Sequence, residues 1–166
     1  MDENLLRFIV EICNKLDISV PIISFETSQF TSDTMMAQCL SNGTKIYLRK
    51  KDIADPDYLF AIVHELRHVW QIKTDKENYF ATYKTIDMLD SIEEYNLQPA
   101  ELDANAYAGY IMQLYFGLTP LYKTIFEYTT PEYSPHDVIY LPTNCTRSLF
   151  VHLLPLFQLQ MPRAIP

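Results

Sequence analysis

The segment from Asp55 to about Lys76 constrains the fold most strongly. Asp55-Pro56 predicts a helix start, because Asp caps free backbone N–H groups and Pro suits the first helical position. Behind it, apolar residues recur every three or four positions, as on one face of a helix. This stripe comprises Leu59, Ile62, Val63, Leu66, Val69 and Trp70, and a second flank comprises Ala61, His64, His68 and Ile72. Since apolar residues occur on both flanks, we expect this helix to lie at the centre of the fold.

Secondary structure is also predicted on both sides of this helix. A helical apolar face near the start comprises Leu5, Phe8, Ile9, Ile12 and Leu16. Strand-like runs cover residues 20–27, 35–40 and 44–49, and Asn42-Gly43 between the last two predicts a hairpin. Alternation in the last run, with Ile46 and Leu48 on one side, predicts a half-buried strand. Residues 78–95 look helical without clear limits, and Pro99 and Gly117 delimit a clearer helix.

These elements predict an α+β fold in which a small mixed or antiparallel sheet with a hairpin packs on the central helix. A length of 166 residues suits a single domain, 1–166, with its own hydrophobic core. We expect that core to span about residues 1–117. Prolines and aromatic residues then punctuate residues 118–166, for which we expect an irregular extension with a short helix at 148–154.

Charge and cysteine content exclude several classes of protein. Thirteen Lys and Arg stand against 21 Asp and Glu, a formal net charge of −8, so phosphate backbones would be repelled and no nucleic-acid partner is expected. Three scattered cysteines, Cys13, Cys39 and Cys145, suit reduced thiols. The N-terminus lacks a signal-peptide pattern, and no apolar run is long enough for a bilayer, so we expect a cytoplasmic protein without membrane contact.

The central segment contains His64-Glu65-Leu66-Arg67-His68, which matches H-E-x-x-H. Residues four apart lie above one another on a helix, so both imidazoles can reach one ion, and their nitrogen atoms suit Zn²⁺. Glu65 lies about 100° round the helix from His64, beside the metal face. From there it could act as the general base on a zinc-bound water and later protonate the leaving amine.

A catalytic zinc needs a third protein ligand, for which the chain offers Glu101, Asp103, His136 and His152. The first lies in the opening turn of the helix after Pro99. Glu101 shares a helix face with Ala104, Asn105 and Ala108. The two small alanines on this face would allow the helix to approach the histidine helix closely. Asp103 lies about 200° away, where we expect it only to compensate the helix dipole.

Asn105, one turn beyond Glu101, could accept the free N–H of a ligand histidine. A solvated polar residue is the alternative interpretation of Asn105. His136 and His152 lie in the C-terminal extension, where a histidine is more often structural than a ligand.

The stretch from Ala61 to His68, together with the later Glu101-x-Asp103-Ala104-Asn105-x-Tyr107-Ala108, resembles the zinc peptidases of the ImmA/IrrE type within the gluzincin-like group. The order of elements agrees over about residues 1–117. This resemblance implies a zincin-like fold, zinc ligands His64, His68 and Glu101, and Glu65 as general base and acid. Family members are typically encoded by bacteria and mobile elements such as phages, and some cleave repressors, so a protein or peptide substrate is implied.

Two further expectations concern recognition. A zincin holds its substrate as an extended strand against a sheet edge, and we expect residues 45–50 to be that edge. Its lysines and arginine could equally protect an edge from aggregation. The alternative to a peptidase is a non-catalytic interaction module on the same fold, which would use the apolar tail Leu149 to Leu159.

Overall fold

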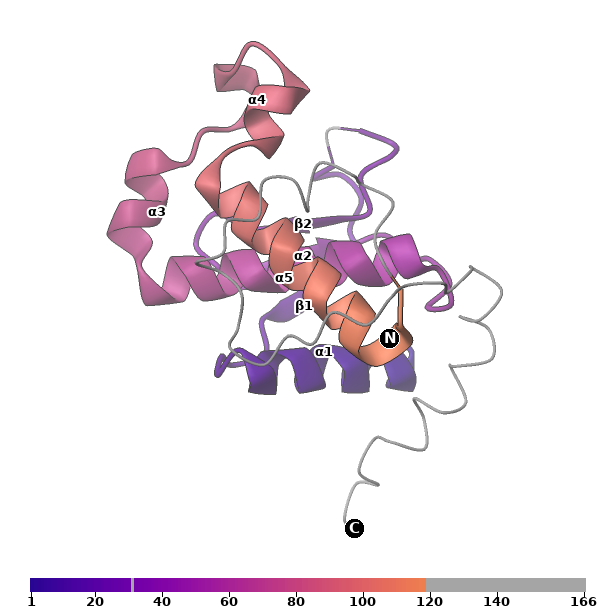
Figure 1. Cartoon of the computed structure of the whole chain (residues 1–166). Helices are drawn as coiled ribbons and strands as arrows, with labels where there is room; N and C mark the ends of the chain where they lie inside the picture. The colour runs from indigo at the N-terminus through magenta and orange to yellow at the C-terminus, as the bar shows by residue number, and fades with distance from the viewer. Residues whose placement is uncertain (31, 119–166) are drawn as a thin grey trace.

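Helix α2 (Pro56–Thr74) lies at the centre of the chain in this computed structural model, which describes residues 1–30 and 32–118 (Figure 1). The Asp55 side chain caps it by accepting the backbone N–H of Asp57, and Pro56 occupies its first turn. The predicted start and the central position are therefore confirmed. The expected short helix at 148–154 and the apolar tail at 149–159 lie outside the described residues.

The other elements give an α+β architecture with a three-stranded mixed sheet, as the sequence predicts. They are α1 (Glu3–Lys15), β1 (Ile22–Ser24), β2 (Ala37–Cys39), β3 (Lys45–Leu48), α3 (Lys76–Thr82), the 3-10 helix η1 (Ile86–Met88), α4 (Ile92–Asn96) and α5 (Pro99–Phe116). Gly117 ends α5 in the left-handed conformation, with φ of 63°. Both limits predicted for this helix are thus confirmed.

The predicted hairpin is present: β2 and β3 pair antiparallel, with Cys39 opposite Ile46. Its turn requires a residue with positive φ, and Gly43 adopts φ of 68°. This glycine also lies against α2, because a Cβ built on it would be 3.2 Å from Cγ2 of Ile72. The hairpin turn therefore packs closely on the central helix.

The prediction that residues 45–50 form a sheet edge is wrong. The strand order is β1-β3-β2, so β3 lies in the middle, parallel to β1 and antiparallel to β2. Ile46, Tyr47 and Leu48 are all buried, so this strand is not half-buried either. Local alternation could not reveal this, because the pairing with β1 joins residues more than 20 positions apart.

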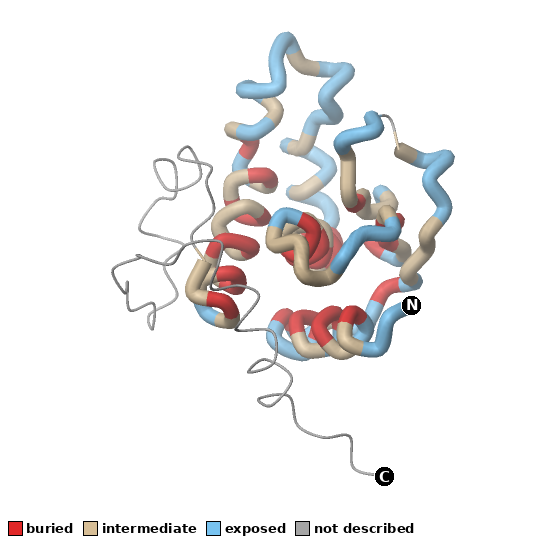
Figure 2. The backbone as a smooth tube through the Cα atoms, turned by 90° about the vertical axis from the view of Figure 1, so that its right-hand side faces the viewer, coloured by how far each residue is buried: buried red, intermediate tan, exposed pale blue. Residues whose placement is uncertain are grey.

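One hydrophobic core lies between α1, the sheet, α2 and α5. The predicted apolar face of α1 is buried, and so is the stripe of α2 except for the half-buried Trp70. Figure 2 shows the buried side of α1 turned toward the other helices. Among the described helices α2 and α5 are the longest, and buried apolar residues of both belong to this core.

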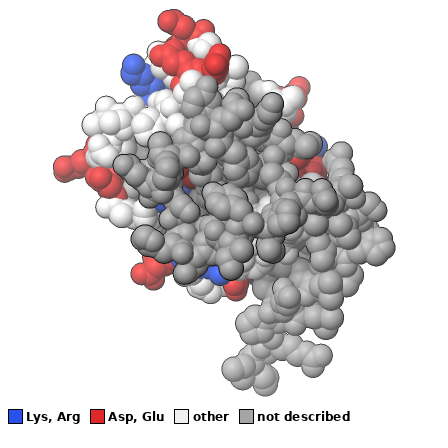
Figure 3. Space-filling view, in the orientation of Figure 1, with Lys and Arg blue, Asp and Glu red and all other residues white. Residues whose placement is uncertain are grey.

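The segment that connects α2 to α5 lies at the surface, since its helices α3, η1 and α4 contain no buried residue. It exposes apolar side chains such as Phe80, Met88 and Ile92. Acidic side chains gather at the end of the molecule where α4 lies (Figure 3). Among the described helices, none has the length and apolar character of a membrane span.

The cap of α2 gives a first test. Replacing Asp55 with Ala removes the acceptor of the Asp57 N–H and should lower the free energy of unfolding by about 1 kcal/mol. Asp55→Asn keeps a good capping group and should retain most of that stability. Urea denaturation of the two variants beside the wild type measures both values. Equal losses in the two variants would contradict the capping role.

Candidate metal centre

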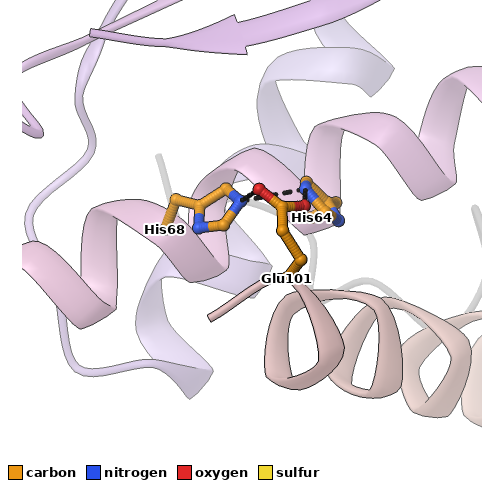
Figure 4. A group of neighbouring side chains, drawn as sticks. All are labelled: His64, His68 and Glu101. Atoms are coloured by element: carbon orange, nitrogen blue, oxygen red, sulfur yellow. Dashed lines mark hydrogen bonds and ion pairs between the residues drawn. The ribbon is translucent and has the colours of Figure 1, made fainter. Parts of the chain in front are cut away.

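Three side chains from α2 and α5 converge at one point. Nε2 of His64 lies 3.2 Å from Oε2 of Glu101, and Nε2 of His68 lies 3.4 Å from Oε1. The two imidazole Nε2 atoms are 2.9 Å apart. In Figure 4 the carboxylate of Glu101 points from the start of α5 at both rings. One ligand atom from each residue falls within 4.8 Å of the others, so this group could hold a metal ion.

Close approach of α5 to α2 makes this convergence possible. Ala104 and Ala108, which share the face of Glu101, are fully buried in the interface. Small side chains at these positions let the first turn of α5 come within reach of the histidines. The structure thus brings together the three residues that the sequence analysis selected. His136 and His152, the other histidines considered, lie outside the described residues.

Each ring is oriented through its second nitrogen. Nδ1 of His64 lies 2.9 Å from Oδ1 of Asn105, which confirms the predicted partner, and Nδ1 of His68 lies 2.8 Å from Oε1 of Gln71. A carbonyl oxygen only accepts, so each ring donates its Nδ1–H. The neutral form of each imidazole then has its lone pair on Nε2, directed into the site.

A cluster of two Nε2 lone pairs and a carboxylate consists of acceptors and needs a cation. In the metal-free chain a proton fills this role. Burial alone would lower the pKa of His64, but the hydrogen bond and charge of Glu101 outweigh burial. The charge of Glu65 and the hydrogen bond to Asn105 act in the same direction, and the pKa of His64 rises to about 9.

The ion pair with His64 also shifts the pKa of Glu101, whose side chain is only 2% exposed. Burial by itself would raise the pKa of this carboxyl. The hydrogen bonds of His64 and His68 and the electrostatic attraction of these rings instead hold its pKa far below the usual range. Glu101 is therefore a carboxylate in the folded protein, as a metal ligand must be.

Glu65 lies on the same helix but outside this group of three. Its Oε2 accepts the backbone N–H of Cys39 at 2.6 Å, so the carboxylate lies beside β2. Leu40 N–H donates to the C=O of Lys45 in β3, and Met36 C=O accepts the N–H of Arg49 just after β3. Because bonding directions alternate along a strand, the Cys39 N–H points away from β3, at the free edge of β2. The carboxylate thus contacts the open edge of the sheet next to the two histidines.

Asp103 does not join the metal group, as predicted, but the expectation that it only compensates the helix dipole is wrong. Its carboxylate forms a bidentate ion pair with Arg67, at 2.7 Å from Nε and 3.0 Å from Nη2. It also accepts Nε2–H of Gln71 at 2.7 Å. The dipole argument considered α5 alone, whereas Asp103 is buried against α2 and needs a charged partner there.

Sequence reasoning missed the tyrosines that approach the site. The Tyr83 hydroxyl donates to Oε1 of Glu101 at 3.0 Å, and it is also hydrogen-bonded to the Tyr95 hydroxyl at 2.5 Å. Burial and the charge of Glu101 raise the pKa of Tyr83, so its proton stays on the hydroxyl. Gln98 fixes the neighbouring backbone by accepting N–H of Lys84 and donating to its C=O. The unusual number of tyrosines was the available signal, but no local pattern selects these two.

No protein-family model, curated protein or solved structure matches the chain. The site consists of two oriented imidazoles, one buried carboxylate and a second carboxylate at the edge of β2.

The proton on His64 gives a test in metal-free protein. An ion pair with Glu101 stabilises the fold fully below the unfolded pKa of 6.5, and this stability is lost as pH rises through about 9. The free energy of unfolding should fall by up to about 3 kcal/mol across this range. Urea denaturation in EDTA from pH 6 to pH 10 measures it, with His64→Asn as control. Identical pH profiles of wild type and control would contradict the assignment.

Proposed function

We propose that the chain is a zinc metallopeptidase in which His64, His68 and Glu101 hold Zn²⁺ and Glu65 acts as general base and acid. The observation that carries the proposal is the convergence of two oriented Nε2 atoms and a buried carboxylate, with Glu65 one residue from the first histidine. Two nitrogen ligands and one oxygen ligand suit zinc and leave its fourth position open, as in catalytic sites. The sequence resemblance to ImmA/IrrE-type peptidases and the α+β fold agree with this proposal.

When bound, Zn²⁺ would supply Lewis acidity, which acidifies water and polarises a carbonyl group. Glu65 takes a proton from the attacking water as the water oxygen bonds to the carbonyl carbon of the scissile amide. The C–N bond then breaks, and Glu65 returns the proton to the amine nitrogen. Tyr83, through its hydrogen bond to Oε1 of Glu101, keeps that carboxylate in place during the reaction.

A polypeptide substrate would add to the sheet as an extended strand along β2. This edge takes the place of the one predicted at residues 45–50, because β3 is paired with a strand on each side. The Glu65 carboxylate already bonds a backbone N–H of β2, so an amide held along this edge lies beside the general base. By the resemblance, a regulatory protein such as a repressor is the substrate class we propose. The alternative interaction module depends on the tail at 149–159, outside the described residues.

Glu65→Gln tests the function. The variant should still bind zinc, because Glu65 is not a ligand, but cleavage should fall by about 10²- to 10⁴-fold without the base. Peptide-library cleavage followed by mass spectrometry measures the rate, and elemental analysis measures zinc in the same samples. Glu3→Gln, at an exposed glutamate of α1, is the control and should cleave like the wild type. A Glu65→Gln enzyme with wild-type rate would overturn the role of Glu65.

A further inference from the structure

We propose that Arg67 is a positioning residue of the metal centre: through Asp103 and Gln71 it sets which ring nitrogen of His68 carries the hydrogen, and so keeps the Nε2 lone pair free for the metal. The inference rests on the proposed zinc site for its functional meaning. Its structural part concerns the metal-free protein and can be tested separately. Arg67 itself lies between the two histidines in sequence, and its guanidinium contacts neither ring in the hydrogen-bond network.

The first step is the fixed position of Asp103. Arg67 holds this carboxylate with two hydrogen bonds, and both side chains are largely buried, at 14% and 9% exposure. The guanidinium is in turn placed against aromatic faces, 3.7 Å from the ring centroid of Trp70 and 4.9 Å from that of Tyr107. A planar fork is suited to such bidentate, stacked pairing, whereas lysine is not. Asp103 therefore has little freedom to rotate.

The second step is the orientation of the Gln71 amide. Its Nε2 donates to Oδ2 of Asp103 at 2.7 Å and to the backbone C=O of Ala100 at 2.9 Å. Both of these partners only accept, and an amide nitrogen has two hydrogens. Both hydrogens are thus used on α5, and the Gln71 oxygen must face His68.

The third step follows for the imidazole. Because Nδ1 of His68 faces the Gln71 oxygen, the neutral ring must carry its hydrogen on Nδ1. The lone pair on Nε2 is then free for a metal. If Asp103 were displaced, the Gln71 amide could turn and present its NH₂ group to Nδ1. The neutral ring would then carry its hydrogen on Nε2, the nitrogen that must bind the metal. The ion pair of Arg67 disfavours this unproductive tautomer.

The other histidine provides an internal comparison. His64 bonds directly to Asn105, and the hydrogen bonds of Arg67, Asp103 and Gln71 do not include it. Loss of the Arg67 ion pair should therefore change the tautomer of His68 and leave the hydrogen bond of His64 in place. A general loss of packing would disturb both rings together.

The experiment combines zinc affinity with ¹⁵N NMR of the histidine rings in full-length protein. The variants are Arg67→Lys, Asp103→Asn and Gln71→Met, the last of which keeps the ion pair and removes only the amide. Arg7→Lys, at the exposed Arg7–Glu3 pair, is the matched control. In EDTA, wild type and control should show His68 with hydrogen on Nδ1, and the three variants should show a mixture of tautomers. Competition with a chromophoric chelator should give about 10- to 100-fold weaker zinc binding for the variants.

The outcomes separate this inference from the function. Wild-type tautomers in all three variants, with unchanged zinc affinity, would overturn the inference and leave the peptidase proposal intact. A wild type that binds no zinc would overturn the peptidase proposal, while the His68 tautomer in EDTA would still decide the inference. If Asp103→Asn does not fold, Arg67→Lys still tests the ion pair and Gln71→Met tests the amide through which the pair acts, and a wild-type His68 tautomer in both would overturn the inference.

Discussion

The buried carboxylate of Glu101 is the constraint on which the rest of the structure depends. A carboxylate removed from water is costly unless charges and hydrogen bonds compensate it. Here two imidazoles and the Tyr83 hydroxyl surround it, and these come from α2 and from the segment between the two helices. The position of α5 against α2 and the position of the connecting segment are thus both tied to one negative charge.

The polar contacts around Glu101 continue along the interface of α2 and α5. The side-chain oxygen of Asn105 accepts Nδ1–H of His64, and that of Gln71 accepts Nδ1–H of His68. The Gln71 amide nitrogen also donates to the backbone of α5. The Arg67–Asp103 ion pair completes the set. Such a buried network is stable only if its members are satisfied, and it then holds one arrangement of side chains. Ring orientation at the site is therefore part of the same packing that joins the helices.

Local signals were sufficient for part of this structure. Asp55-Pro56, Asn42-Gly43 and the Pro99 to Gly117 span predicted the elements correctly, because caps and turns act over a few residues. Helical spacing also predicted that His64 and His68 lie together, and the family resemblance selected Glu101 from four candidates as the third residue. Contacts between distant segments left no such pattern, and so the parallel pairing of β1 with β3, the approach of Tyr83 and the Arg67–Asp103 pair emerged only from the fold.

The central claim is that the His64, His68 and Glu101 group binds zinc, and metal content tests it most directly. Wild type, Glu101→Ala and the control Glu3→Gln would be purified side by side without added metal and submitted to elemental analysis. The account predicts about one zinc per chain in wild type and control, and a large loss in Glu101→Ala, since loss of one ligand sharply weakens binding. A folded wild type that contains no zinc and does not take up added zinc would contradict it.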